Sequence, residues 1–178
     1  GCARPLEFQS GKPSVSKPLP ENKDNVFVDE SGDKPNWEVR IQNENTKVLV
    51  IGASNMRKAR EVTLPPNWEV HSFPGAKFQH ASALLRKMTV TENLRHISLQ
   101  VGVNHRDERP TKYLGDLRKT MDALRKLESN NINFSFSVTG VSVDPHRLPP
   151  GHRENVKVIN DLLEAEAHMH TRALQKRF

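Results

Sequence analysis

Three small polar residues, each placed just after a short apolar run, have the chemistry of an acyl-transfer site. Ser54 follows the first run, Gly75 the second and Asn104 the third. A serine hydroxyl can attack a carbonyl carbon. The backbone N–H groups of Ser54 and Gly75, with the Asn104 side-chain amide, can donate to the oxyanion that then forms. Each residue alone is also typical of an ordinary turn or cap, so their order along the chain carries the hypothesis.

The apolar runs in front of these residues have the length and composition of strands. The first, from Lys47 onward, is almost wholly apolar, rich in β-branched residues and stopped by Gly52, which is typical of a strand buried on both faces. A later segment alternates polar with apolar residues, as a strand with one buried face does. The predicted strands are 48–51, 68–73, 96–101 and 131–138.

Segments with helical spacing of apolar residues separate the predicted strands. The clearest covers 112–128, where leucines and a methionine recur every three or four residues, and the others cover 79–88 and 151–168. Strands that alternate with helices favour a parallel sheet with right-handed crossovers. We therefore expect a three-layer α/β/α, doubly wound domain. In such a sheet the carboxyl ends of the strands share one edge, where ligands bind, so the fold would bring Ser54, Gly75 and Asn104 together.

The first part of the 178-residue chain differs in composition from the rest. Residues 1–45 are rich in Pro, Ser and charged residues, which predicts a disordered linker or tail, and residues 46–178 are expected to form the domain. Residues 1–46 hold 6 Lys or Arg against 8 Asp or Glu, a balance of −2, whereas the remainder carries +8. A basic domain can attract nucleic acid, although interleaved acids also fit ordinary solvated surfaces. The cations nearest the predicted site are Arg57, Lys58, Arg60, Arg106, Arg109 and Lys112.

Composition also excludes several classes of protein. The single cysteine, Cys2, excludes an internal disulfide framework and a cysteine-rich metal site, and it favours an intracellular setting. No apolar run is long enough for a membrane span. His168 and His170 do not share a helix face at their spacing, so they do not indicate a metal site, and no cofactor is expected. The chain lacks a signal peptide and does not begin with Met, so we expect a fragment or a processed product.

Three short sequence blocks follow the first three predicted strands. They are Gly52-Ala53-Ser54-Asn55, Phe73-Pro74-Gly75-Ala76 and Gly102-Val103-Asn104-His105. At these blocks the chain resembles the SGNH (GDSL-like) hydrolase superfamily, over about residues 46–168. The second and third blocks are most similar to SGNH-type domains of animal retrotransposon proteins. The resemblance implies a serine ester hydrolase for acyl or acetyl esters, with Ser54 as nucleophile and Gly75 and Asn104 completing the oxyanion hole.

Two departures from the family pattern bear on activity. Ala53 stands where the family has an Asp that orders the oxyanion loop. The Asp-x-x-His block that supplies the base is also missing, and Asp144-Pro145-His146 has the wrong spacing. The resemblance places that block beyond the helix ending near His168, so we expect the last strand and helix of the fold to be absent. The histidines considered as substitute bases are His80, His105, His146, His152, His168 and His170, of which His105 is the best placed but is expected to face solvent.

Three functions therefore remain open on the sequence. The first is an ester hydrolase whose base lies in a longer parent protein. The second is a module that keeps the fold without turnover and binds protein or nucleic acid, with phosphates contacting Arg57, Lys58, Arg106 and Arg109. The third is a non-functional remnant of a mobile element.

Overall fold

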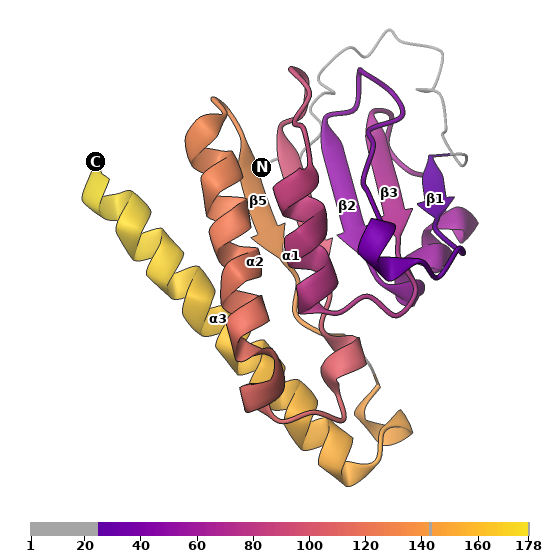
Figure 1. Ribbon diagram of the computed structural model, residues 1–178, viewed down its shortest axis with the longest axis vertical. Helices are drawn as coiled ribbons and strands as arrows, with labels where there is room; N and C mark the ends of the chain where they lie inside the picture. The colour runs from indigo at the N-terminus through magenta and orange to yellow at the C-terminus, as the bar shows by residue number, and fades with distance from the viewer. Residues whose placement is uncertain (1–24, 143, 178) are drawn as a thin grey trace, which may run out of the picture.

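A five-stranded, all-parallel β-sheet forms the centre of the molecule (Figure 1). The computed structural model describes residues 25–142 and 144–177. The sheet has the order β1-β3-β2-β4-β5, which confirms the predicted α/β class with a parallel sheet. Its strands are β1 (Val26–Val28), β2 (Val48–Gly52), β3 (Trp68–Ser72), β4 (His96–Gln100) and β5 (Ser135–Val138).

The register of the three inner strands aligns their carboxyl ends. Gly52, the last residue of β2, pairs with Ser72 of β3 on one side and with Gln100 of β4 on the other. The loops that follow these strands therefore start side by side at one edge of the sheet. This edge is where the sequence predicts the site.

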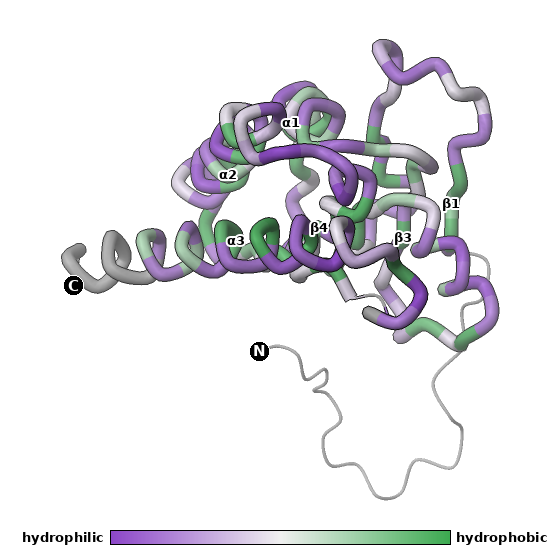
Figure 2. Tube along the Cα trace, turned by 90° about the horizontal axis from the view of Figure 1, so that it is seen from below, coloured by the Kyte–Doolittle hydropathy of each residue, from purple (hydrophilic) through white to green (hydrophobic). Residues whose placement is uncertain are grey.

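Two α-helices cover one face of the sheet, and a third extends along it past β5 (Figures 1 and 2). Their apolar residues and the inward residues of β2 and β4 form the main core, in which Leu49, Leu117 and Ile159 are fully buried. Pro110 is the first residue of the helix that ends at Asn130, a position where a backbone N–H would have no partner within the helix, so proline loses no hydrogen bond there. The helices are α1 (Phe78–Lys87), α2 (Pro110–Asn130) and α3 (Pro150–Arg177). None of the described helices is long and apolar enough to cross a membrane.

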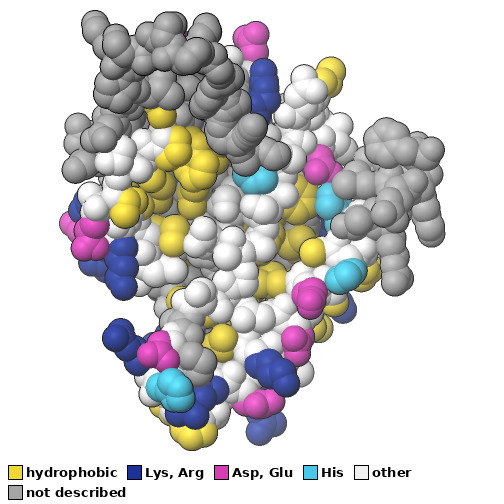
Figure 3. Space-filling view, turned by 180° about the vertical axis from the view of Figure 1, so that it is seen from behind, with side chains coloured by type: hydrophobic (Ala, Val, Ile, Leu, Met, Phe, Trp, Pro, Cys, Tyr) yellow, Lys and Arg dark blue, Asp and Glu magenta, His cyan; other side chains and the backbone are white. Residues whose placement is uncertain are grey.

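Figure 3 is turned toward the opposite face of the sheet, which among the described residues is covered by a 3₁₀ helix. The 3₁₀ helix η3 (Ser54–Glu61) packs against β1, β2 and β3. A small apolar cluster lies beneath it and includes Val50, Leu64 and Val70. Further along this face the side chains are polar, as the hydrogen bonds of His96 with two serines of β5 show. The short 3₁₀ helices are η2 (Lys34–Asn36), η4 (Val103–His105) and η5 (Pro145–Arg147).

The predicted tail of residues 1–45 needs correction. Its first part, 1–24, lies outside the described residues, but 25–45 belong to the folded domain. They supply β1 and Trp37, whose side chain is 2% exposed and whose carbonyl accepts a hydrogen bond from Lys87 Nζ on α1 at 2.6 Å. The prediction failed here because the few apolar residues of this segment are widely spaced, so they show neither a strand nor a helix period.

Candidate active site

Ser54 lies at the carboxyl end of β2, on the surface. A Cβ at Gly52 would collide with Met56 Cγ and lie 3.1 Å from the Gln100 carbonyl oxygen, so only glycine fits where the chain leaves the sheet. The chain then turns at once into η3, of which Ser54 is the first residue. The Ser54 side chain is exposed, and its hydroxyl makes no hydrogen bond with any residue that the structure describes.

Ala53 is held by the neighbouring strand. Its side chain is fully buried in the main core. Its carbonyl accepts hydrogen bonds from the Ser72 hydroxyl of β3 at 2.8 Å and from the Met56 N–H at 3.0 Å. The turn that carries Ser54 is therefore ordered by a serine of β3, at the place where the family that the sequence resembles uses a carboxylate.

Gly75 follows β3 in a backbone conformation that favours glycine, with a φ of +83°. A Cβ at this position would lie 3.1 Å from the Nζ atom of Lys34. The lysine side chain therefore covers the Gly75 turn and brings a positive charge to it. Sequence reasoning missed Lys34 because it falls within the predicted tail.

Asn104 is joined directly to the loop that contains Gly75. Its Nδ2 donates a hydrogen bond to the carbonyl of Ala76 at 3.0 Å. This bond links the loop after β4 to the loop after β3 and leaves the second N–H of the amide without a partner among the described residues. Asn104 and Gly75 are thus brought together, on the two strands that flank the strand of Ser54.

The loop that contains Asn104 is also fixed from α3. Gly102 has a φ of +144°, and a Cβ there would lie 2.9 Å from Val141 Cγ2 and 3.3 Å from Ile159 Cγ2. On the far side of the loop, Asn155 Nδ2 donates to the Arg106 carbonyl at 2.9 Å. These contacts hold the loop between the start of α1 and the first half of α3.

His105 is buried, which overturns the expectation that it faces solvent. Its Nε2 accepts a hydrogen bond from the Phe78 N–H at 3.0 Å, and its Nδ1 donates to Glu108 Oε1 at 2.6 Å. The other Glu108 oxygen accepts from Lys77 Nζ at 2.6 Å. Burial lowers the pKa of His105, against the opposing effect of Glu108. Because both ring nitrogens are engaged, His105 positions the start of α1 and is not free to act as a base.

The other five histidines considered as bases form no hydrogen bond with Ser54 among the described residues. His80 accepts the Lys77 N–H at Nδ1 over 2.9 Å, and its ring lies edge-on to Trp37. Burial, together with the charges of Lys34 and Lys77, lowers its pKa. His170 packs against Phe136 of β5. The remaining three are His146, His152 and His168.

A buried carboxylate–histidine pair on β3 was not predicted. Glu69 is fully buried and accepts hydrogen bonds from the Gln42 and Asn43 N–H groups, from the Thr46 hydroxyl and from His71 Nε2. Burial opposes ionisation of Glu69, but these hydrogen bonds outweigh it and lower the pKa to about 2. The signal was in the sequence, because residues 69 and 71 share one face of a predicted strand.

Comparison with known proteins identifies the fold. No family model matches the chain, and no curated protein matches its sequence. Among solved structures, an α/β hydrolase enzyme from the metagenome of Lake Arreo, Spain, is similar, with a TM-score of 0.51 and 13% identity over 71% of this chain and 74% of that chain. The chain therefore has a hydrolase fold. A GDSL-like lipase from Bacteroides thetaiotaomicron aligns with a TM-score of 0.48 and 13% identity over 74% of this chain and 68% of that chain.

Together these positions place a hydroxyl and several hydrogen-bond donors at one edge of the sheet. The exposed Ser54 hydroxyl, the Gly75 turn and the spare N–H of Asn104 lie at the ends of three adjacent strands. Such a set can bind a carbonyl compound and stabilise negative charge on its oxygen. Within the described residues, no imidazole reaches the serine to accept its proton.

Proposed function

We propose that this chain is an SGNH-type serine hydrolase domain that acts on acyl or acetyl esters, of the kind found in retrotransposon proteins. The observation that supports this most is the hydrogen bond from Asn104 to the Ala76 carbonyl. It links the two loops that would supply oxyanion donors, on either side of β2, the strand that precedes Ser54. The hydrolase fold is consistent with this assignment.

In the proposed reaction, Ser54 Oγ attacks the ester carbonyl and the alcohol leaves, which gives an acyl-enzyme that water then hydrolyses. The N–H groups of Ser54 and Gly75 and the amide of Asn104 donate to the oxyanion. The ammonium group of Lys34, beside Gly75, adds favourable charge. Because no described histidine accepts the serine proton, Ser54 is a weak nucleophile at neutral pH, and turnover by this chain is expected to be slow.

Hydrolysis of p-nitrophenyl acetate, followed by intact-protein mass spectrometry, tests this proposal without requiring fast turnover. We expect the wild-type protein to gain one acetyl group, Ser54→Ala to gain none, and Asn104→Ala to acylate more slowly. Ser129→Ala, a substitution of an exposed serine at the end of α2, is the control and should behave as wild type. Equal acylation of the wild-type protein and Ser54→Ala would remove Ser54 from any mechanism.

A second function, phosphate binding, is favoured by the charges beside Ser54. Arg57, Lys58 and Arg60 on η3 are exposed, and none forms an ion pair with a described residue. Arg109, after η4, is likewise exposed and unpaired among the residues described, and half-buried Arg106 donates only to the Val103 carbonyl. Such cations can bind the phosphates of nucleic acid.

Fluorescence anisotropy with a labelled single-stranded RNA tests the second function. We expect binding at low salt that weakens steeply as salt rises, and a shallower salt dependence for Arg57→Gln/Lys58→Gln. The control is Arg118→Gln/Lys119→Gln, which removes two exposed cations from α2. Equal losses in the two double variants would mean that net charge alone drives binding.

A further inference from the structure

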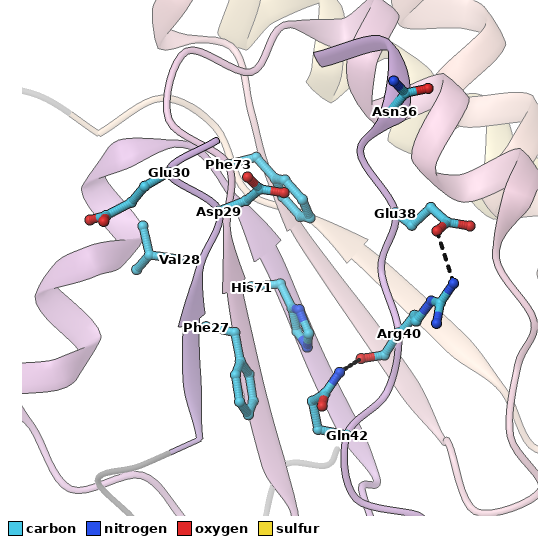
Figure 4. A pocket seen from close by; sticks show the side chains of 10 residues that line it. All are labelled: Phe27, Val28, Asp29, Glu30, Asn36, Glu38, Arg40, Gln42, His71 and Phe73. Carbon is cyan, nitrogen blue, oxygen red and sulfur yellow. Dashed lines mark hydrogen bonds and ion pairs between the residues drawn. The ribbon is translucent and has the colours of Figure 1, made fainter. Parts of the chain in front are cut away.

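A cavity lies beside the edge strand β1, apart from the residues proposed for catalysis (Figure 4). It has a volume of about 450 Å³ and lies between β1 and the segment 36–42, which crosses in front of β3. Ser54, Gly75 and Asn104 do not line it. A cavity of this size can hold a small ligand.

Aromatic rings form the inner wall of this cavity. The rings of Phe27 on β1 and His71 on β3 lie next to each other, with centroids 5.1 Å apart, and the buried Phe73 follows the last residue of β3 (Figure 4). Faces of such rings attract cations as well as apolar groups.

His71 presents to this cavity a ring nitrogen without a partner among the described residues. Its Nε2 lies 2.9 Å from Glu69 Oε1. Glu69 also accepts hydrogen bonds from the Gln42 and Asn43 N–H groups and from the Thr46 hydroxyl. Because the ionised carboxylate can only accept, the hydrogen between Glu69 and His71 belongs to His71 Nε2. In the neutral ring Nδ1 then carries the lone pair, and it has no hydrogen-bond partner among the described residues. The side chain of His71 is 7% exposed.

The outer wall of the cavity is acidic. Asp29, Glu30 and Glu38 line it, and Arg40 is the one lining cation. Arg40 pairs with Glu38 across 3.2 Å, with both side chains largely exposed. The charges of the four ionisable side chains Asp29, Glu30, Glu38 and Arg40 therefore sum to −2 on a chain whose net charge is +6. This local negative charge attracts cations to the cavity, although the net positive charge of the whole chain repels them.

We propose that this cavity binds an organic cation, an alkylammonium or alkylguanidinium with a short apolar stem. The stem lies against the rings of Phe27 and His71, and the cation faces Asp29 and Glu38, whose side chains lie on either side of the rings (Figure 4). One N–H of the ligand donates to His71 Nδ1. A free amine and a basic side chain of a peptide share this chemistry.

Isothermal titration calorimetry of the full chain with agmatine tests the proposal. We expect saturable binding, about fivefold weaker in Asp29→Asn and in Glu38→Gln, because each removes one charge interaction with the ligand. Arg40→Gln should tighten binding, because it removes the competing cation from Glu38. Glu92→Gln, which changes an exposed carboxylate away from the cavity, is the matched control and should bind as wild type. An amide ¹H–¹⁵N spectrum of each variant shows that it is folded.

Neutral and anionic probes with a short apolar stem separate charge recognition from simple apolar binding. Butyramide and butyrate should bind more weakly than agmatine. No agmatine binding, equal affinity for the three probes, or an Arg40→Gln variant that binds no better than wild type would overturn the proposal. A blocked Gly-Arg-Gly peptide decides the source of the ligand: binding as tight as that of agmatine supports a peptide side chain, and binding of agmatine alone supports a free amine.

Discussion

Ser54, just after β2, and Glu69, on the neighbouring strand β3, have opposite surroundings. The Ser54 hydroxyl is exposed and has no hydrogen-bond partner within the described residues, whereas the Glu69 carboxylate is fully buried and accepts from two backbone N–H groups, Thr46 and His71. Perturbed pKa values often mark catalytic groups. Here they mark the groups that hold segments in place, because Glu69 fixes residues 42–46 and His105 fixes the start of α1.

The largest expected effect tests the anchoring role of Glu69. Glu69→Ala leaves buried donors of Thr46, His71 and the backbone unsatisfied and should lower the free energy of unfolding by about 4 kcal/mol. Urea denaturation followed by circular dichroism measures this change. Glu92→Ala, at an exposed position, should stay within about 0.5 kcal/mol of wild type. A loss below about 1 kcal/mol for Glu69→Ala would contradict the anchoring role.

The next largest effect concerns the residue before Ser54. Ala53→Asp restores the carboxylate of the resembled family, but it places that group in the main core, where Ala53 is fully buried. The free energy of unfolding should fall by about 3 kcal/mol, because a buried carboxylate without donors is costly. The same denaturation experiment measures it, with Ala53→Ser as the milder comparison. A stable Ala53→Asp protein that acylates faster would instead mean that the turn rearranges to use the acid.

Acidification should destabilise the protein in two stages. The pKa values of His80, His96 and His105 lie below the ordinary value of 6.5, so the unfolded chain binds protons first and stability falls as the pH drops below about 6.5. The pKa of Glu69 is about 2 in the folded protein and 4.5 ordinarily, so the stability that ionised Glu69 adds is lost as the pH falls from about 5 toward 2. Thermal melts across this range measure both stages. His105→Gln should reduce the slope of the first stage and leave the second stage unchanged, and an unchanged slope in that variant would assign the first stage to the other two histidines.

The smallest effect is expected at Ser54. Ser54→Ala should change the free energy of unfolding by less than about 0.5 kcal/mol, because its hydroxyl is exposed and makes no hydrogen bond within the described residues. Differential scanning calorimetry measures the melting temperature. A decrease in the free energy of unfolding above about 1 kcal/mol would show that Ser54 supports the turn, as Glu69 supports residues 42–46.

The regular elements of the fold were predictable because their signals are local. The apolar run of β2 and the leucine spacing of α2 were both interpreted correctly. The three-residue strand β1 was missed, since it is too short to show a period and is held by pairing with β3. Trp37 was missed because its burial depends on contacts with Phe73 and α1, far away in sequence.

The candidate site was predictable only in its placement. The topology of a parallel sheet brings the ends of β2, β3 and β4 together, so the neighbourhood of Gly75 and Asn104 followed from the order of the strands. The burial of His105 did not follow from the order of the strands, because a single 3₁₀ turn decides whether the side chain after Asn104 faces the core. The catalytic roles of Ser54, Gly75 and Asn104 remain predictions.

The clamped loop around Asn104 has a consequence for selectivity. Gly102 lies close to Ile159 and Val141, and the Arg106 carbonyl accepts a hydrogen bond from Asn155, so a ligand that contacts Asn104 does not have to order this loop. Because the loop is held in this way, it also cannot move outward to make room for a larger ligand. Any discrimination between small and bulky ligands at this edge would therefore come from exclusion by a fixed wall rather than from closure around the ligand.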